Sequence, residues 1–372
     1  MKIVYFTHSL VSCWNHGNAH FLRGLLRALK DRGHTVHACE PQDGWSRRHL
    51  AAELGADPAE RFLARFPDLD IVSSYTALHD AQALVDGADL VIVHEWNDPA
   101  LVAALGRMKA RGSARFVLLF HDTHHRAISS PDEIAALDLS GYDGVLAFGR
   151  SLADVYRRAG WGSRAFVLHE AADTALFHRP ARPEPTDRHG VVWIGNWGDG
   201  ERSEEIASYL LRPARTAGIP IDIYGVRYPE SIIPALLHHG ACYRGWIAND
   251  EVPAAFARHL FTVHVPRRHY ADRLPGIPTI RVFEALACGL PLLSAPWDDS
   301  ESLFDIGTDF LMAFSEEETS RCMRALAADA GLRQTLAEQG LATISQHHTC
   351  QHRADELLAI VTQVSRSLEG VA

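Results

Sequence analysis

The segment 274–296 places one carboxylate, that of Glu284, on the apolar face of a short helix. Pro278 is tolerated in the first turn of such a helix, and Gly289 can close it with a left-handed cap. The neighbours of Glu284 on this face are apolar, so its carboxylate needs hydrogen-bond donors. A carboxylate held in this way can bind the hydroxyl pair of a ribose. The alternative is a helix at the edge of the core whose Glu284 reaches solvent or a neighbouring arginine.

The start of the same helix is suited to an anion. Thr279, Ile280 and Arg281 lie at the first N–H groups, which lack partners inside a helix and form the positive end of its dipole. Arg281 adds a full positive charge. A phosphate at this helix start and a diol on Glu284 together describe a bound nucleotide, which is our prediction for the segment.

A second group of chemically capable residues lies in Phe120–Arg126, where His121 ends an apolar run. A neutral imidazole at the end of a strand can donate a hydrogen bond to a substrate or move a proton. One alternative is a metal held by His121, His124 and His125, although no H-E-x-x-H motif or Cys/His knuckle accompanies them. The other is a polar loop with incidental histidines. We expect no metal.

The turn His16–Asn18 precedes the first long amphipathic stretch. Gly17 would let the backbone approach a ligand closely, and a helix start favours anions. A plain turn with Asn18 as helix cap explains the same residues equally well.

The loop Ile194–Arg202 is rich in glycine and follows an apolar run. Such a loop can cradle a phosphate, with Arg202 supplying charge-assisted hydrogen bonds and Asn196 lying in the turn. It is neither a Walker A loop nor a G-x-G-x-x-G fingerprint, so we predict no dinucleotide cofactor. In Tyr243–Ile247, the backbone at Gly245 and the rings of Tyr243 and Trp246 could hold a nucleobase; a buried tryptophan in a strand is the alternative.

Apolar strand-like runs alternate with helical stretches along most of the chain, which predicts two α/β domains with parallel sheets. The proline-rich segment 179–188 reads as a linker between a first domain over 1–180 and a second over 181–372. The strands are expected at 2–6, 35–39, 89–94, 115–121, 144–148 and 164–168, then at 190–195, 219–225, 242–247, 260–265, 290–295 and 309–314. Ligands of such sheets bind beyond the carboxyl ends of the strands.

Composition narrows the classes of protein. The 372 residues are 47% hydrophobic and carry a formal net charge of −10, which argues against a broad nucleic-acid or anionic-membrane surface. Six scattered cysteines without a C-x-x-C pair suit reduced thiols. Neither a signal peptide nor a run of about 20 apolar residues is evident, so we expect a cytoplasmic protein without a transmembrane segment.

The chain resembles the GT-B-fold glycosyltransferases, in particular the retaining family-4-like enzymes and their CgeB-like branch. The resemblance rests on Arg281–Ser294, R-V-F-E-A-L-A-C-G-L-P-L-L-S, supported by Ile223–Gly225, Tyr243–Ile247 and His121–Asp122. It implies two Rossmann-like parallel-sheet domains facing each other across a cleft, with a C-terminal helix over 351–368 crossing back to the first domain.

The resemblance also implies roles for individual residues. A nucleotide-sugar donor is held mainly by the second domain, and the acceptor faces the first. Glu284 matches the family's ribose-binding glutamate, and His121 matches the histidine that contacts the transferred sugar. The remaining matches are the diphosphate contacts at Arg202, Thr279–Arg281 and Gly17, and the border of the base at Tyr243–Trp246.

Two positions depart from the family pattern. The E-x7-E signature places a glutamate at position 276, where this chain has Gly276, and a basic residue is often found where Asn196 stands. The first departure bears on which sugar is bound and on whether its configuration is retained. CgeB-like sequences tend to share it.

We therefore predict a metal-independent glycosyltransferase with His121, Arg202 and Arg281 as catalytic residues. It moves a hexose-type sugar from a nucleoside diphosphate sugar, with UDP or GDP as the nucleotide, to an unidentified glycan, lipid, protein or small molecule. Retention of configuration is expected. The rivals are an epimerase or phosphorylase on the same fold, and a non-catalytic protein that binds nucleotide sugars.

Overall fold

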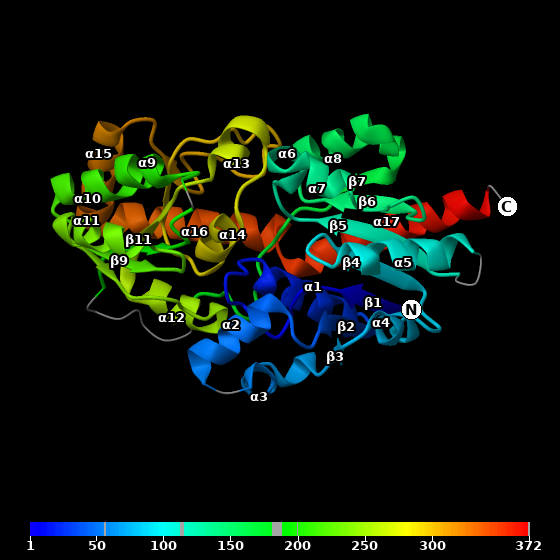
Figure 1. Cartoon of the computed structure of the whole chain (residues 1–372). Helices are drawn as coiled ribbons and strands as arrows, with labels where there is room; N and C mark the ends of the chain where they lie inside the picture. The colour runs from blue at the N-terminus through cyan, green and yellow to red at the C-terminus, as the bar shows by residue number, and fades with distance from the viewer. Residues whose placement is uncertain (56, 112–114, 181–187, 199, 371–372) are drawn as a thin grey trace. The chain divides into compact units, whose positions relative to one another are not determined.

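The computed structural model describes residues 1–55, 57–111, 115–180, 188–198 and 200–370. The chain forms two compact units (Figure 1). One consists of Met1–Glu170 with Cys350–Ala372, and the other of Ala171–Thr349. Of the expected linker, residues 181–187 lie outside the described part of the chain.

The first unit is built on a seven-stranded parallel sheet with the order β3-β2-β1-β4-β5-β6-β7. Its central strands are buried on both faces and apolar except at their carboxyl ends, where His94, His121 and Asp122 lie, as expected of a parallel sheet covered by helices. The strands are β1 (Lys2–Phe6), β2 (Thr35–Pro41), β3 (Val72–Tyr75), β4 (Leu90–His94), β5 (Val117–Asp122), β6 (Gly144–Ala147) and β7 (Ala165–Val167).

The strand order reverses between β1 and β4, where Phe6 pairs with Val93. On the next pair of strands, His94 lies opposite His121. Ligands of doubly wound sheets bind beyond the carboxyl ends of the strands at such a reversal. The fold thus brings the loops after β1, β4 and β5 to one edge.

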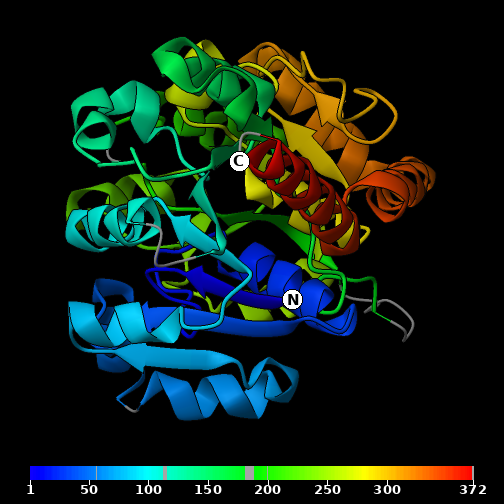
Figure 2. The same ribbon diagram turned by 90° about the vertical axis from the view of Figure 1, so that its right-hand side faces the viewer.

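The C-terminal helix belongs to the first unit, although it follows the second in sequence. It packs against α1 (Figure 2) and buries Ala354, Leu357, Val361 and Val364. The helices of this unit are α1 (Ala19–Asp31), α2 (Trp45–Leu54), α3 (Pro58–Arg65), α4 (Leu78–Leu84), α5 (Pro99–Ala110), α6 (Arg126–Ser129), α7 (Pro131–Ala135), α8 (Arg150–Tyr156) and α17 (Cys350–Glu369).

The second unit repeats the plan with a six-stranded parallel sheet of order β10-β9-β8-β11-β12-β13. Its order reverses between β8 and β11, where Val192 pairs with Thr262. The strands are β8 (His189–Ile194), β9 (Ile221–Tyr224), β10 (Ala241–Tyr243), β11 (His259–His264), β12 (Leu292–Ser294) and β13 (Leu311–Met312).

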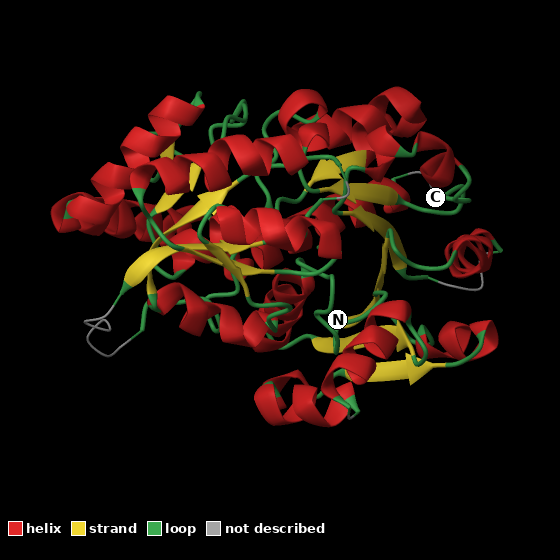
Figure 3. Cartoon of the chain, turned by 60° about the vertical axis from the view of Figure 1, so that its left-hand side comes forward, coloured by secondary structure: helices red, strands yellow, loops and turns green. Residues whose placement is uncertain are grey.

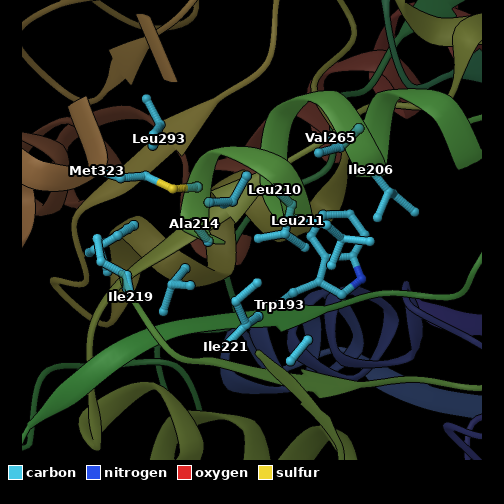
Figure 4. Packing of buried hydrophobic residues seen from close by; sticks show 14 of the residues in the cluster. Trp193, Ile206, Leu210, Leu211, Ala214, Ile219, Ile221, Val265, Leu293 and Met323 are labelled. Carbon is cyan, nitrogen blue, oxygen red and sulfur yellow. The ribbon is translucent and has the colours of Figure 1, made fainter. Parts of the chain in front are cut away.

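Helices flank this second sheet (Figure 3) and share a core with it. Figure 4 shows Trp193 and Ile221 from the strands packed with Leu210, Leu211 and Ala214. The helices are α9 (Ser203–Ile206), α10 (Arg212–Ala217), α11 (Ile233–His238), α12 (Val252–Ala257), α13 (Arg268–Arg273), α14 (Ile280–Ala287), α15 (Glu316–Ala328) and α16 (Ala330–His347).

The fold class predicted from the sequence, two parallel-sheet Rossmann-like domains, is confirmed. Several local expectations were wrong. The strand expected at 242–247 ends at Tyr243, and Pro278 precedes α14 instead of lying in its first turn. Asn18 does occupy the cap position of α1, but its side chain makes no capping bond and instead donates to the Thr123 hydroxyl at 3.1 Å.

Candidate functional site

Arg202 lies at the carboxyl edge of the second sheet, next to the reversal of strand order. Its side chain is almost fully buried and donates to the carbonyl oxygens of Val265 at 3.1 Å and Asn196 at 2.7 Å. The guanidinium carbon lies 5.1 Å from the centre of the Trp193 ring. Arg202 therefore fixes the loop after β8 to the residue that follows β11.

The same edge concentrates positive charge. Burial lowers the pKa of Arg202 to about 10, and the nearby charges of Arg267 and Arg281 act in the same direction. Arg202 nevertheless stays protonated at neutral pH. Its Nε has no hydrogen-bond partner among the described residues. Arg267 is paired with Glu201 and Arg281 with Glu284. Three neighbouring guanidinium groups at this edge can stabilise a diphosphate.

Helix α14 starts at this edge. Thr279 is its cap residue and makes no side-chain capping bond, so the first N–H groups from Ile280 onward are not satisfied by that side chain. Arg281 is bonded to Glu284 one turn later. Glu284 is completely buried and does not reach solvent. The alternative to ribose binding was a Glu284 side chain that reaches solvent or a neighbouring arginine, and the structure shows the contact with the arginine.

Tyr243 is connected to the loop after β8 through backbone carbonyls. Its hydroxyl donates to the Gly225 carbonyl at 2.9 Å, and its ring lies 4.7 Å from that of Tyr228. Tyr228 in turn donates to the Gly195 carbonyl at 2.8 Å. A side chain at position 225 would meet that same carbonyl oxygen at 2.1 Å, so only glycine fits there. Gly245 accepts from the Gly225 N–H at 2.8 Å.

The predicted donor-binding residues of the second unit thus lie along one connected edge: Asn196, Arg202, Tyr243, Gly245, Thr279, Ile280, Arg281 and Glu284. Trp246 follows β10 and is half-buried. It therefore does not form the buried strand tryptophan that was the alternative for this segment.

Gly276 has a left-handed backbone, with φ of 85°, and its N–H donates to the Asp298 carbonyl at 2.6 Å. A Cβ at this position would meet Cγ of Glu301 at 2.5 Å and its Oε1 at 2.9 Å. The side chain of Glu301 thus lies in the space that a glutamate at position 276 would enter. Glu301 therefore places a carboxylate beside position 276, where the family pattern has a glutamate.

Sequence reasoning missed His264, the last residue of β11. Its Nδ1 lies 2.8 Å from the Ser294 hydroxyl, and its Nε2 has no partner among the described residues. Burial lowers the pKa of His264 to about 3, with a smaller contribution from Arg202, so the ring is neutral. The sequence feature that indicates His264 is its position at the end of an apolar strand, which is the feature on which the prediction of His121 was based.

In the first unit, β5 extends to Asp122, one residue beyond the expected strand end, so His121 is its second-last residue; the side chain of His121 is completely buried. Burial lowers its pKa to about 3, so the imidazole is neutral. Its Nδ1 lies 2.6 Å from the Tyr5 hydroxyl, while its Nε2 has no partner among the described residues. A hydrogen bond donated by Tyr5 to Nδ1 leaves the proton on Nε2, ready to be donated to a ligand.

Further histidines surround His121 at this edge. The ring centres of His8 and His16 are 4.0 Å apart, and His94 lies 5.9 Å from His121. Burial lowers the pKa of His8 to about 3 and holds those of His16 and His94 well below the usual value. A group of neutral imidazoles offers donors and acceptors without charge, which suits the hydroxyl groups of a sugar better than a phosphate.

Gly17 is exposed in the turn between His16 and α1. The bond from Asn18 to the Thr123 hydroxyl fixes this turn to the loop after β5, and His94 Nε2 lies 3.0 Å from the same hydroxyl. The predicted first-unit residues, Gly17 and His121, therefore lie along one edge of one sheet.

The histidine loop does not gather metal ligands. Across the described residues, the ligand atoms of three metal-binding side chains come within 4.8 Å of one another at one place, His189–Asp222–His259 in the second unit. The set His121, His124 and His125 does not meet this distance.

Two buried carboxylates lie beside the histidines. Burial raises the pKa of Asp122 to about 6, although a 2.6 Å bond from the Tyr156 hydroxyl opposes the shift. Burial and the nearby Asp122 raise the pKa of Glu95 well above its usual range, while its bond to Arg126 acts in the opposite direction. With a pKa of about 6, the Asp122 carboxyl group can exchange protons near neutral pH.

Comparison with known proteins gives one family match and many structural ones. A family model described as "Glycosyl transferase-like" matches residues 202–359, which include Arg202, α14 and most of the second unit. No curated protein matches the sequence. No helix within the described residues is long and apolar enough to cross a membrane.

The structural matches are distant in sequence but extend over whole chains. The Anabaena protein HepE in complex with UDP has a TM-score of 0.64 at 15% identity, with 100% of both chains covered. Sucrose-phosphate synthase of Thermosynechococcus elongatus has a TM-score of 0.64 at 14% identity, also over 100% of both chains. T4 phage BGT in complex with UDP and Mn2+ has a TM-score of 0.60 at 13% identity, covering 97% of this chain and 99% of the other. The protein has the GT-B fold, with two Rossmann-like parallel-sheet units.

Proposed function

We propose that the protein is a glycosyltransferase that moves a hexose-type sugar from a nucleoside diphosphate sugar to an acceptor. The observation that carries the proposal is the continuous edge of Arg202, Arg281 and Glu284 at the strand reversal of the second sheet. The match of residues 202–359 to the glycosyltransferase-like family supports it. UDP, bound by the similar HepE, is the proposed nucleotide, and GDP is the alternative.

The leaving diphosphate gains negative charge as the bond to the sugar breaks. We assign the stabilisation of this charge to Arg202, Arg281 and the first N–H groups of α14. Arg281 would move from Glu284 to the diphosphate, which frees the carboxylate for the ribose hydroxyls. Because guanidinium groups and a helix start supply the positive charge, the proposed reaction needs no metal at the diphosphate.

We assign contact with the transferred sugar to two further groups. The Nε2 proton of His121 would be donated to a sugar hydroxyl. Glu301 would take the part of the carboxylate that Gly276 lacks, because its side chain extends to that position. With a carboxylate at this place, we propose retention of configuration.

The binding assignment is tested by replacing Glu284 with glutamine. Glu284→Gln keeps the volume but loses the charge, and a hydrogen bond to a charged group contributes about 1.5–3 kcal/mol. We expect KM for the donor to rise about 10–100-fold. Glu356→Gln is the matched control, because Glu356 forms the same i,i+3 pair with an almost buried arginine, Arg353, in α17. The control should leave KM unchanged.

The measurement combines thermal shifts with UDP, GDP, ADP, CDP and TDP and an assay of nucleotide release. A ligand at 100 times its Kd stabilises the folded state by about 2.7 kcal/mol. We expect one nucleotide to shift the wild type and Glu356→Gln but not Glu284→Gln. An equal shift in all three proteins contradicts the ribose assignment. Donor turnover that needs phosphate identifies a phosphorylase, and binding without turnover across acceptors identifies a binding protein.

A further inference from the structure

A separate group of side chains lies at the opposite edge of the second sheet, where the strands begin. His189 is the first residue of β8, His259 is the first residue of β11, and Asp222 is the second residue of β9. The proposed donor residues lie at the carboxyl ends of these strands. The mechanism proposed above therefore gives these three residues no role.

We propose that His189, Asp222 and His259 form a binding site for a divalent transition metal of the zinc type. The ligand atoms of the three side chains all lie within 4.8 Å of one another. The Asp222 oxygen Oδ2 is 3.2 Å from His259 Nε2 and 3.9 Å from His189 Nε2. Two ligands of a tetrahedral zinc, each about 2.1 Å from the ion, lie roughly 3.4 Å apart. The observed separations bracket that value.

The hydrogen bonding of His259 also indicates a cation. Its Nδ1 faces the Ala255 carbonyl oxygen at 2.7 Å, which can only accept, so Nδ1 is the nitrogen that carries the proton. In a neutral ring Nε2 then presents a lone pair toward Asp222 Oδ2, which is a second acceptor. A metal ion between the two resolves this conflict. Metal-binding histidines commonly donate their other N–H to a backbone carbonyl, as His259 does.

The other carboxylate oxygen of Asp222, Oδ1, also has a hydrogen-bond partner. Arg244 Nε donates to Oδ1 at 3.1 Å, which orients the carboxylate and leaves Oδ2 directed at the histidines. A Cβ at position 190 would meet the Pro220 carbonyl oxygen at 2.3 Å. The glycine next to His189 therefore lets the start of β8 approach the segment that precedes β9. Hydrogen-bonded ligating carboxylates of this kind are typical of metal sites.

The ligand set selects the ion. Two imidazoles and one carboxylate suit Zn2+, Co2+, Ni2+ or Cu2+, whereas Mg2+ and Ca2+ prefer oxygen ligands. His259 is buried and Asp222 nearly so, while the side chain of His189 is 55% exposed, which leaves room for water as a fourth ligand. An ion here would join the starts of β8, β9 and β11 and stabilise the second unit.

The competing explanation is a protonated His259 paired with Asp222. In that case Nε2 would carry a proton as well and would donate it to Asp222 Oδ2 at 3.2 Å. The two explanations differ in whether the protein binds a metal, which can be measured directly.

The test uses the chain of 372 residues, stripped with EDTA and titrated with ZnCl2 in a calorimeter. We expect one Zn2+ per chain in the wild type, and at least a 10-fold weaker affinity or loss of that site in His189→Ala and in Asp222→Asn. His79→Ala is the matched control, because His79 lies 3.1 Å from the Asp80 carboxylate and the described residues provide no third ligand there. The control should bind like the wild type. Co2+ should give the visible absorption of a tetrahedral ion in the wild type, and not in His189→Ala.

His189 is exposed, so its replacement should leave the metal-free protein folded with an unchanged melting temperature. A wild type without a zinc site, or a His189→Ala variant that binds Zn2+ as tightly as the wild type, overturns the proposal. The nucleotide-induced thermal shift should persist in EDTA. This separates failure of the metal site from failure of the proposed transferase function.

Discussion

At the scale of single residues, the pair formed by Arg281 and Glu284 is central. A buried carboxylate on an apolar helix face needs a donor, and an arginine three residues earlier supplies it. The pair lies beside Arg202, whose pKa is lowered by burial and by nearby positive charges. An anionic ligand would relieve the repulsion among these arginines, so this edge is electrostatically suited to a diphosphate.

Gly276 allows a quantitative test at the same scale. Gly276→Ala should destabilise the second unit by about 1–2 kcal/mol through its left-handed backbone, and further through the contact with Glu301 Cγ at 2.5 Å. Gly240→Ala is the control, because Gly240 has a φ of 74° and no atom within 4 Å of the added Cβ. Urea unfolding of the wild type and of both variants would measure the change in the free energy of unfolding.

The excess cost of Gly276→Ala over the control should fall when Glu301 is replaced by alanine in the same chain, and the contact of the added Cβ with the Ser300 hydroxyl at 3.0 Å should account for the remainder. Equal costs in the presence and absence of the Glu301 side chain would show that Glu301 does not fill the space at position 276. The adjacency of Glu301 to position 276 is also the basis of its proposed role toward the sugar.

At the scale of elements, α14 depends on close packing with α16. Gly340 lies within α16, and a Cβ at this position would meet Leu286 Cδ2 of α14 at 2.7 Å and the Asp309 carbonyl oxygen at 2.9 Å. The backbone oxygen cannot move away as a flexible side chain can. Glycine at 340 therefore lets the two helices approach each other.

Gly340→Ala should destabilise the protein by about 1–3 kcal/mol through overpacking, although alanine favours a helix by about 1 kcal/mol over glycine. Because α14 would shift, the Kd for the nucleotide should also rise. Gly331→Ala in the first turn of the same helix meets only the Asp329 side chain, at 3.2 Å, and should be neutral or stabilising. Denaturant titration and calorimetry measure both effects. A stabilising Gly340→Ala variant contradicts the packing argument.

At the scale of the whole molecule, the first unit is completed by the last helix of the chain. Residues 350–369 return as α17, where the Arg32 guanidinium pairs with Asp355 at 2.7 Å and donates to the Gln351 carbonyl at 2.8 Å. The buried leucine and valines of this helix each contribute about 1.5–3 kcal/mol. The first unit is therefore discontinuous in sequence and should be incomplete without the C-terminus.

Truncation after Thr349 should unfold the first unit while the second, over Ala171–Thr349, stays folded. Limited proteolysis should then cut within residues 1–170 and spare the second unit, which should keep its nucleotide-induced thermal shift. Leu357→Ala, at a buried position of α17, should weaken the first unit by about 2–5 kcal/mol. Leu358→Ala, at the next and less buried position, should do so less. A protease-resistant first unit in the truncated protein would contradict this account.

The sequence by itself determined what local patterns specify. Apolar runs predicted most strands, Gly289 with φ of 62° follows α14, and Glu284 was identified as a buried carboxylate because its face of the helix is apolar. The resemblance carried by the segment around Glu284 led to the fold. These features depend on neighbours within a few residues, so they can be recognised before the fold is known.

Only the tertiary structure decided which distant segments meet. Strand order places β8 beside β11, which brings Arg202 to the Val265 carbonyl and near His264. The same non-local packing puts Glu301 at Gly276 and joins His189, Asp222 and His259. No short-range pattern encodes these contacts, because they arise from crossover connections and from burial shared by whole elements.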